Sequence, residues 1–470
     1  MTQTIRADLC IIGAGSGGLS VAAGAAMLGR KVVLIEKGEM GGDCLNTGCV
    51  PSKALIAAAA QAQAMREAGK FGLGAIEPQV DFSAVMDHVH GVIGAIAPLD
   101  SQERFEGLGV TVLREHAAFT GPREVTAGGH TIKAKHFVIA TGSTPFVPPI
   151  DGLASVPYFT NETIFSNRTR PDHLIIIGGG PIGAEMAQAH RRLGANVTVI
   201  EGGKMLNRED PELADVVRQR LLNEGVVIVE DARAEKVAKS GADVSVSLGA
   251  RTISGSHLLV AVGRKPTVDG MNLEAAGVEY SPKGIKTDAR LRTSNKRIYA
   301  MGDVAGGRQF THVAGYHASV LVRNILFKMP AKNNEHLSPR VTYCDPELAQ
   351  VGLTEAEARE RHDDVKIARW PFSQNDRAEA ERDTEGFVKI VTDKKGAILG
   401  AGIVGSGAGD LLQPWTLAIT SKLKIRAFTD IIAPYPTRGE ASKRAAGDWY
   451  SGALFSARTR RLISLLSIFD

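Results

Sequence analysis

Hydrophobic positions near the start of the chain form two short runs separated by a stretch of small residues. The first run, DLCIIGAGSGG from residue 8, passes into Gly13, Gly15 and Gly18, and the second run, KVVLIE, ends at Glu36. Between them lies LSVAAGAAMLG, whose small side chains suit a tightly packed helix. Short apolar runs bounded by glycine are typical of buried strands. The pattern therefore predicts a strand, a helix and a second strand in succession.

The same pattern returns from residue 173. HLIIIGGGPIG carries Gly178, Gly180 and Gly183, and the stretches AEMAQAHRRLG and ANVTVIE follow, the latter ending at Glu201. In both copies the glutamate lies 18 positions after the third glycine. Glycines at this spacing let the backbone approach a pyrophosphate at a helix N-terminus, and the acidic residue binds a ribose. One such motif is weak, whereas two matched copies predict two dinucleotide-binding domains and an α/β fold. The copies also end alike, because FVIATGSTP (137–145) resembles LLVAVGRKP (258–266).

Length and charge limit the class of protein. The 470 residues exceed what one hydrophobic core supports, so about two to four domains are expected. A net charge of +4, with no basic patch interleaved with aromatic residues, gives no indication of nucleic-acid binding. Residues 9–28 are apolar enough to resemble a signal peptide or a membrane span, but five glycines argue against both. We expect a cytoplasmic protein.

Two cysteines, Cys44 and Cys49, lie five positions apart in GGDCLNTGCVPSK, in a chain with four cysteines. A structural disulfide, a metal site and a redox pair are the alternatives. Persistent disulfides are rare in the cytosol and a zinc site would lack half of its ligands, so a redox pair without a metal is favoured. Residues five apart in a regular helix point in different directions, so a distorted turn is predicted, helped by Gly48 and Pro51. FAD and a nicotinamide form a productive pair beside such a disulfide.

Three segments carry a family resemblance. GGDCLNTGCVPSK, KRIYAMGDVAG (296–306) and YCDPELAQVGLTE (343–355) resemble the pyridine nucleotide-disulfide oxidoreductases, the group of lipoamide dehydrogenase, glutathione reductase and mercuric reductase. The resemblance implies FAD, NAD(P)H and a homodimer whose active site is shared across the interface. It also implies two Rossmann-like domains and an α+β dimerisation domain. The expected boundaries are 1–148 and 269–338 for the FAD domain, 149–268 for the NAD(P) domain and 339–470 for the dimerisation domain.

The resemblance assigns roles to individual residues. Cys49 would be the flavin-side thiolate and Cys44 the thiol that meets the substrate, while Lys53 would lie by the flavin and pair with Glu185; an exposed helix ion pair is the alternative for these last two. Asp303 would hold the flavin ribitol. Thr311 begins a helix whose dipole would face the flavin, and His312 and His317 are expected to pack or cap. The residues expected at the cofactors are Gly13, Gly15, Gly18, Glu36, Lys53, Thr141, Gly142, Gly178, Gly180, Gly183, Glu201, Gly263, Arg264, Gly302, Asp303 and Thr311.

One stretch departs from the family pattern. Lipoamide dehydrogenase and glutathione reductase use a histidine from the dimer partner as acid-base catalyst, followed five residues later by a glutamate. In APYPTRGE (433–440) Glu440 is present, but Tyr435 takes the histidine position, and the last histidine of the chain is His362. PYPT and REDPE resemble mercuric reductase, although the cysteine pair of that enzyme's C-terminus is missing after Cys344.

We therefore predict an FAD-dependent NAD(P)H oxidoreductase that passes electrons through Cys44 and Cys49 to a disulfide, a metal ion or another small oxidant. A dihydrolipoamide dehydrogenase proper and a redox-sensing or binding protein with low turnover are the alternatives. NADH is favoured because Glu201 would repel a 2′-phosphate, although Lys204 and Arg208 lie near enough in sequence to bind one.

The C-terminal stretch RTRRLISLLSIFD is basic and then apolar, with Leu462, Leu465, Leu466 and Phe469 on one helical face. Two interpretations stand. The favoured one is a helix packed on the dimerisation domain, and the other is a helix on a membrane surface.

Overall fold

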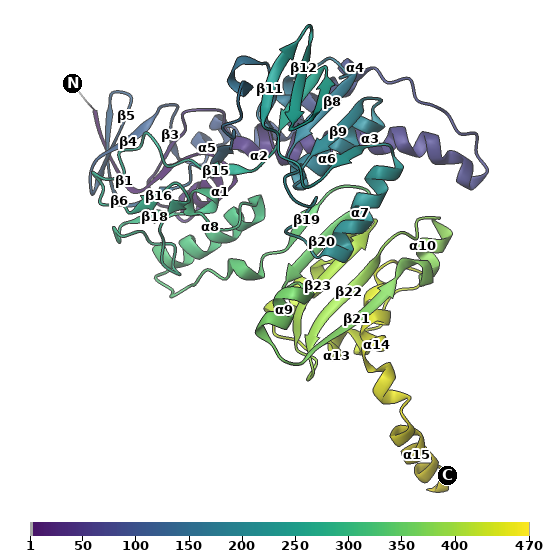
Figure 1. Cartoon of the computed structure of the whole chain (residues 1–470). Helices are drawn as coiled ribbons and strands as arrows, with labels where there is room; N and C mark the ends of the chain where they lie inside the picture. Colours follow the sequence, from purple (N-terminus) through teal and green to yellow (C-terminus); the bar gives the residue numbers. More distant parts are fainter. Residues whose placement is uncertain (1–2, 470) are drawn as a thin grey trace. The chain divides into compact units, whose positions relative to one another are not determined.

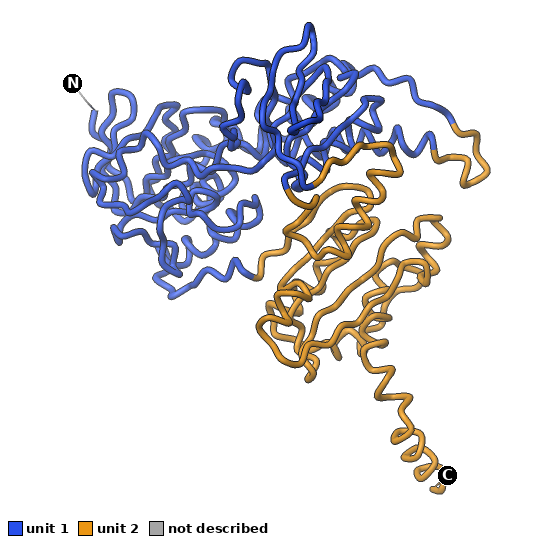
Figure 2. Tube along the Cα trace, in the orientation of Figure 1, with its two compact units in different colours: residues 1–66, 76–202, 231–336 blue, residues 67–75, 203–230, 337–470 orange. Residues whose placement is uncertain are grey.

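The computed structural model describes residues 3–469 and shows alternating strands and helices followed by a mainly antiparallel region (Figure 1). The chain divides into two compact units, drawn in different colours in Figure 2. Unit 1 holds residues 3–66, 76–202 and 231–336, and unit 2 holds residues 67–75, 203–230 and 337–469. Each unit has its own buried hydrophobic residues, as a chain of this length requires.

The first sheet of unit 1 is built around the first glycine motif. Its parallel part runs in the order β3, β2, β1, β6, β18, and an antiparallel extension, β5 and β4, continues from the first half of β6. The strands are β1 (Gln3–Ile12), β2 (Val32–Ile35), β3 (Thr111–Leu113), β4 (Ala117–Gly121), β5 (Glu124–Ala127), β6 (His130–Ile139) and β18 (Ile298–Ala300). β2 is buried on both faces, which explains its unbroken apolar sequence.

The second sheet of unit 1 repeats this arrangement. β8 (His173–Ile177) lies in parallel between β9 (Asn196–Ile200) and β14 (His257–Val260). An antiparallel sheet, β11, β12 and β13, lies in the crossover before β14. Its strands are β11 (Lys236–Ser240), β12 (Asp243–Leu248) and β13 (Arg251–Gly255). The predicted repeat of strand, helix and strand is therefore present in both halves.

The two segments that looked alike in sequence pair with each other. β7 (Ser143–Pro145) runs antiparallel to β15 (Arg264–Pro266), with Ser143 opposite Pro266 and Pro145 opposite Arg264. The chain leaves the first sheet and returns from the second through this ribbon. The two similar segments are therefore partner strands, and they also hold equivalent positions in the two repeats.

Helices of unit 1 cover the sheets and carry the site. α1 packs against α8, where Leu19 and Leu321 are buried in one hydrophobic cluster. The helices that begin in unit 1 are α1 (Ser16–Met27), α2 (Gly42–Asn46), α3 (Cys49–Glu67), α4 (Phe82–Ile96), α5 (Gln102–Gly107), α6 (Pro181–Arg192) and α8 (Thr311–Ile325). Short strands β16 (Tyr280–Ser281) and β17 (Gly284–Ile285) complete the unit.

One helical stretch among the described residues, Phe82–Gly107, is long and apolar enough to cross a membrane by length and composition alone. It is divided into α4, a 3₁₀ turn at Ala97–Asp100, and α5, which begins after the capping residue Ser101. The Ser101 hydroxyl accepts a hydrogen bond from the Arg104 amide at 3.2 Å. The stretch is therefore a succession of short helices.

Unit 2 contains an antiparallel sheet in the order β19, β20, β23, β22, β21. Trp415 and Phe428 stack beneath it with ring centroids 3.6 Å apart, and the indole nitrogen of Trp415 donates to Ser442 at 3.0 Å. The strands of this sheet are β19 (Arg340–Thr342), β20 (Glu347–Gly352), β21 (Val365–Pro371), β22 (Phe387–Asp393) and β23 (Ile398–Gly405). Unit 2 also holds β10 (Val227–Val229), which is not part of this sheet. The helices are α7 (Pro211–Asn223), α9 (Glu355–Arg361), α10 (Asp376–Ala380), α11 (Ala408–Leu411), α12 (Gln413–Thr420), α13 (Arg426–Asp430), α14 (Glu440–Leu454) and α15 (Ala457–Leu466).

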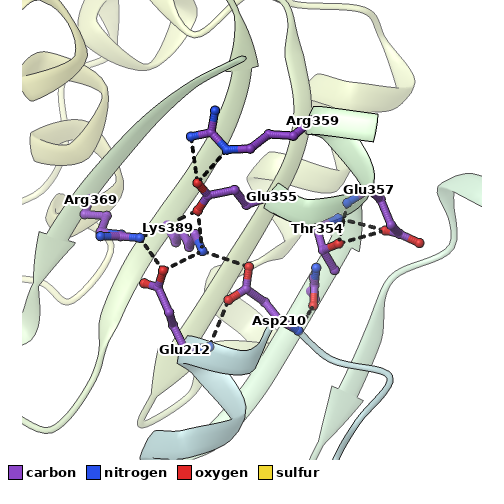
Figure 3. Close-up of polar contacts among 9 residues, drawn as sticks. Asp210, Glu212, Thr354, Glu355, Glu357, Arg359, Arg369 and Lys389 are labelled. Carbon is purple, nitrogen blue, oxygen red and sulfur yellow. Dashed lines mark hydrogen bonds and ion pairs between the residues drawn. The ribbon is translucent and has the colours of Figure 1, made fainter. Parts of the chain in front are cut away.

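A buried lysine fastens α7 to this sheet (Figure 3). Lys389 of β22 is 2% exposed, and its ammonium lies 2.9 Å from Asp210, 3.2 Å from Glu212 and 2.9 Å from Glu355. Burial opposes the charge, but hydrogen bonds to Asp210 and Glu355 outweigh it and raise the pKa of Lys389. Helix α7 therefore packs on the sheet of unit 2, and the sequence-based boundary of the NAD(P) domain at residue 268 stays a prediction.

The C-terminal helix differs from the favoured expectation. Helix α15 was expected to pack on the dimerisation domain, yet none of residues 457–469 is buried, and Figure 1 shows α15 projecting from the end of α14. Leu462, Leu465 and Leu466 are each more than half exposed. Helix α15 is therefore not packed on the dimerisation domain of its own chain.

Candidate active site

The two glycine turns of unit 1 have the same geometry. Gly13 and Gly178 have φ values of +106° and +113°, which only glycine adopts without strain. A Cβ on Gly18 would lie 1.9 Å from the carbonyl oxygen of Gly13, and a Cβ on Gly183 would lie 1.9 Å from that of Gly178. Both positions therefore require glycine for close packing of the helix onto the strand.

The middle glycine of each turn has a different environment. A Cβ on Gly15 or Gly180 would meet no atom within 4 Å, although both residues stand immediately before a helix N-terminus. Helix termini carry amides without helical partners, and a Cβ would obstruct a phosphate approaching them. The residues present therefore fit a pyrophosphate at each turn, as FAD and NAD(P)H require.

The predicted ribose carboxylates occupy equivalent places. The amide of Ala14 donates to Glu36 at 2.6 Å, and the amide of Gly179 donates to Glu201 at 2.6 Å. Glu36 also accepts from the Gly38 amide at 2.7 Å. Each carboxylate is thus held at the end of its second strand, next to its glycine turn, where it can accept hydrogen bonds from ribose hydroxyls.

Residues of the β7 and β15 ribbon join the flavin segment. Arg264 donates to the Ser143 hydroxyl at 2.7 Å and its guanidinium lies 3.3 Å from Asp43, while Ser143 donates to Asp303 at 2.5 Å. Burial raises the pKa of Asp303, and the Ser143 hydrogen bond and Arg264 oppose that rise. Thr141 donates to the carbonyl of Thr267 at 2.7 Å. The positive φ angles of the three expected glycines, Gly142, Gly263 and Gly302, are +66°, +136° and +66°.

The cysteine segment forms the predicted distorted turn. α2 ends at Asn46 and α3 begins at Cys49, so the two cysteines lie on separate helices and no regular turn connects them. A Cβ on Gly48 would lie 2.8 Å from a carboxylate oxygen of Asp43, which explains the glycine at that position. Both cysteines are thiols here, and their side chains share a hydrogen bond.

The two thiols ionise as a pair. A hydrogen bond from Cys49 lowers the pKa of Cys44 to about 6, and the hydroxyls of Thr311 and Ser16 assist. The same hydrogen bond, together with burial, raises the pKa of Cys49. The protein alone therefore places the thiolate on Cys44, whereas the sequence assigned the flavin-side thiolate to Cys49. That assignment requires the shared proton to move to Cys44 when FAD is bound, and it stays a prediction.

Lys53 and Glu185 form the expected ion pair. The ammonium of Lys53 lies 2.8 Å from Glu185, which α6 supplies. The side chain of Glu185 is 7% exposed but that of Lys53 is 37% exposed, so only the carboxylate is deeply buried. Lys53 also donates to Ser52 at 3.3 Å. The pair joins the cysteine helix to the helix of the second glycine motif.

The start of α8 lies beside the cysteines. The Thr311 hydroxyl is 3.2 Å from the sulfur of Cys49. His317 is 1% exposed; it accepts from the Gly302 amide at 3.1 Å and its other ring nitrogen lies 3.0 Å from Glu335. His312 stacks on Phe310 with centroids 5.2 Å apart. Both histidines therefore have the packing role that the sequence suggested.

Tyr435 and Glu440 belong to unit 2. The Tyr435 side chain is exposed, and its hydroxyl donates to Asp376 at 2.7 Å, which raises the pKa of the phenol. Glu440 begins α14 and pairs with Arg444 at 2.8 Å. The phenol is thus held as a hydrogen-bond donor to a carboxylate.

Sequence reasoning missed several polar residues that hold the site. Asp43 accepts from Thr47 at 2.9 Å and from Asn161 at 2.9 Å, which fixes the turn between the cysteines. Arg233 lies beside Gly202, the residue after Glu201, because a Cβ on Gly202 would be 3.4 Å from the Arg233 Cγ. Asp43 was visible within the cysteine motif, whereas nothing in the sequence connected Asn161 or Arg233 to the site.

Two dinucleotide turns, a thiol pair and a lysine-glutamate pair within one unit define a flavin- and nicotinamide-dependent oxidoreductase with a redox-active disulfide. Residues 7–318 match the family model for pyridine nucleotide-disulphide oxidoreductase, and residues 338–446 match the dimerisation domain of that family. The chain belongs to this family, and the dimerisation-domain match indicates a homodimer.

Known relatives and solved structures agree with this assignment. The chain is 36% identical over 451 residues to a mercuric reductase of Streptomyces lividans, covering 93% of this chain and 95% of the relative. It is 37% identical over 458 residues to a dihydrolipoyl dehydrogenase of Thermus scotoductus, covering 93% and 96%. The Cu(II) complex of the HOCl-induced flavoprotein disulfide reductase RclA from Escherichia coli superposes with a TM-score of 0.84 at 28% identity, covering 93% and 98%. The predicted family, fold class and FAD-dependent NAD(P)H oxidoreductase function are confirmed.

Proposed function

We propose that the natural acceptor is a thiol-binding oxidant, a soft metal ion foremost, and that oxidation of dihydrolipoamide is a minor activity. The observation that carries this proposal is the hydrogen bond from Tyr435 to Asp376. A phenol whose pKa is raised by a carboxylate donates a hydrogen bond and does not accept a proton at neutral pH. The residue at the histidine position is therefore unsuited to act as a general base.

The chemistry of the two acceptor classes differs at this step. Oxidation of a dithiol requires a base that forms the attacking thiolate, and loss of a general base typically costs about 10²- to 10⁴-fold in rate. Binding and reduction of a soft metal ion require a thiolate on the protein itself. Cys44, whose pKa the hydrogen bond from Cys49 lowers to about 6 in the protein alone, is the sulfur from which a bound metal ion would displace the shared proton.

Within this proposal the residues have distinct tasks. FAD, when bound, accepts two electrons from NAD(P)H and passes them to the cysteine pair. Cys49 is the flavin-side sulfur, Cys44 contacts the acceptor, and Tyr435 of the second subunit positions a metal ion held by thiolate. A two-electron acceptor consumes one NAD(P)H, whereas two Cu(II) ions, reduced to Cu(I), consume one between them.

Names of relatives support a metal acceptor. Mercuric reductases of Streptomyces lividans, Lysinibacillus sphaericus and Staphylococcus aureus resemble this chain at 35–36% identity, and the solved flavoprotein disulfide reductase binds Cu(II). Dihydrolipoyl dehydrogenases resemble it equally, so the acceptor is decided by the residues of the site.

We also propose that NADH is preferred over NADPH. Glu201, held by the Gly179 amide, is placed to accept the ribose hydroxyls and repel a 2′-phosphate. Lys204 lies near enough in sequence to bind a 2′-phosphate, but its ammonium is 3.5 Å from the carboxylate of Glu230 within unit 2. The boundaries of the three functional domains remain those proposed from the sequence.

The test compares acceptors in the wild-type holoenzyme and three variants. Initial rates with dihydrolipoamide, glutathione disulfide, Hg(II) and Cu(II) are measured for wild type, Tyr435→His, Tyr435→Phe and Asp376→Asn. Tyr435→His should raise dihydrolipoamide activity, Tyr435→Phe should lower metal reduction selectively, and Asp376→Asn should leave metal reduction within roughly threefold of wild type, as loss of an exposed contact predicts. Wild-type turnover of dihydrolipoamide at hundreds per second or so would overturn the proposal.

A further inference from the structure

The helix α15 and the turn that follows it form an exposed apolar surface that the oxidoreductase chemistry does not use. Leu462, Ile463, Leu465 and Leu466 are 55–61% exposed, and Phe469 is 87% exposed. Leu454 and Phe455, at the end of α14, extend the surface and are 55% and 66% exposed. Soluble proteins rarely leave such a run of large apolar side chains uncovered without a binding partner.

The apolar residues lie on one face of the helix. Positions 462, 465, 466 and 469 follow the i, i+3, i+4, i+7 spacing of a single face. Arg460, Ser464 and Ser467 follow the same spacing on the opposite face. The helix is therefore amphipathic: the leucine face begins one turn after Arg458, Arg460 lies on the opposite face with the serines, and Arg461 lies at the border between the faces.

Two hydrogen bonds hold the N-terminus of α15. The Ser456 hydroxyl accepts from the Thr459 amide at 3.2 Å, and the Thr459 hydroxyl donates to the carbonyl of Ala453 at 2.8 Å. These bonds cap α15 and tie it to the last turn of α14. A helix of this length is marginal in water by itself, so burial of its apolar face would add to the stability that the cap provides.

The charged residues of α15 indicate what kind of surface it binds. The arginines Arg458, Arg460 and Arg461 are the charged residues between Asp448 and Asp470, a stretch without aspartate or glutamate. Two copies of this helix would bring six arginines together with no carboxylate of their own, which disfavours self-association through it. A surface with negative charge at its boundary and an apolar interior would bind the arginines and the leucine face of α15 together.

We propose that α15 lies in the interfacial region of an anionic phospholipid bilayer, with its leucine face among the acyl chains and its arginines at the phosphate groups. This proposal does not depend on the acceptor. It reverses the interpretation favoured by the sequence, because α15 buries none of its residues against the rest of its own chain.

Vesicle co-sedimentation of the full-length holoenzyme tests the proposal. Vesicles of phosphatidylcholine alone are compared with vesicles of equal parts phosphatidylcholine and phosphatidylglycerol. Three arginines at an anionic surface should strengthen binding by roughly 100-fold, and the difference should shrink at high salt. A triple variant R458Q/R460Q/R461Q should lose the preference for anionic vesicles, and L462S/L466S should lose binding to both.

The matched control is S464A/S467A, which alters the polar face and should bind as wild type does. NADH oxidation in solution should be unchanged in every variant, which shows that each is folded. Wild-type protein that stays in the supernatant with anionic vesicles overturns the proposal. A change of molar mass in light scattering for L462S/L466S, without vesicle binding by wild type, would assign the face to contacts between copies of the chain and overturn it equally.

Discussion

The two dinucleotide-binding halves of unit 1 have nearly the same backbone but different chemistry. Their glycine turns and ribose carboxylates coincide in geometry, down to the 2.6 Å hydrogen bond at each glutamate. Their first helices differ, because Ser20 of α1 bonds only to the Ser16 carbonyl, whereas its equivalent in α6 is Glu185, which pairs with Lys53. The nucleotide fold is thus set by glycine and glutamate, and the chemistry by a few helix positions.

The largest expected effect comes from the glycines that both halves share. Gly18→Ala should abolish FAD retention, because the new Cβ would lie 1.9 Å from the carbonyl oxygen of Gly13 in the turn after β1. Gly183→Ala, with the same 1.9 Å approach to a carbonyl oxygen, should leave FAD bound but weaken NAD(P)H binding by at least about 100-fold, as overpacking at the upper end of about 1–3 kcal/mol predicts. Flavin absorbance of the purified variants and titration with NADH measure the two outcomes.

Gly15→Ala and Gly180→Ala are the matched controls for these variants. Their Cβ atoms meet no protein atom, so the folded chain should survive while the nucleotide turn is obstructed. Equal loss of FAD in Gly18→Ala and Gly183→Ala would show that the halves do not divide the cofactors as described.

The next effect concerns the cysteine pair, which belongs to the first half alone. Cys49→Ser should retain FAD but lose the long-wavelength charge-transfer absorbance on two-electron reduction, and disulfide-dependent turnover should fall at least about 10³-fold. Anaerobic titration with NADH follows the band. Its persistence in the variant would contradict the assignment of Cys49 to the flavin side.

The ionisation of the pair adds a pH dependence. Cys44 is a thiolate above its pKa of about 6, so alkylation by iodoacetamide should fall as the pH drops through 6. In Cys49→Ala the hydrogen-bond donor is gone, so the pH midpoint should move upward. An unchanged midpoint would show that Thr311 and Ser16 stabilise the thiolate by themselves.

A substitution at Glu185 tests the difference between α1 and α6. Glu185→Gln keeps the shape but removes the charge that faces Lys53, and the rate of flavin reduction by NADH should fall by roughly tenfold, because Lys53 is partly exposed to solvent. Stopped-flow absorbance measures this rate. Ser20→Ala, at the equivalent position of α1, is the control and should have no effect on it.

The smallest effect concerns the ribose ends of the two halves. Arg233 lies beside the strand end that carries Glu201. Arg233→Ala should lower kcat/KM for NADPH by roughly two- to fivefold with little change for NADH, because an exposed charge contributes modestly. A clear preference of the wild type for NADPH would show that Arg233, and not Glu201, decides the nucleotide.

The sequence predicted those parts of the molecule that depend on local spacing. Gly13, Gly18 and Glu36 identified the first turn because the motif fixes both backbone and carboxylate within one stretch of chain. The break between α2 and α3 followed from the five-residue spacing of the cysteines. These features involve neighbours in sequence, so a pattern contains them.

The family resemblance supplied one contact between distant residues, the Lys53–Glu185 pair, but other contacts of this kind could not be predicted from the sequence. Asn161 reaches Asp43 across 118 positions, and Lys389 reaches Asp210 across 179 positions, and neither pairing follows from composition or periodicity. The packing of α15 was also misjudged, because an amphipathic pattern shows that a helix has an apolar face but not what covers it.

Because of the buried Lys389, the segment after residue 338 does not contain all the residues that its own sheet needs. A dimerisation domain excised at residue 338 would keep Lys389 but lose Asp210 and Glu212 with α7, leaving a buried ammonium with one of its three carboxylates. Removing partners of a buried charge costs about 3–5 kcal/mol, a large part of the stability of a domain. Gene fusions that exchange acceptor specificity between members of this family should therefore take α7, with Asp210 and Glu212, from the same parent as the C-terminal segment, although the two stretches are separate in the gene.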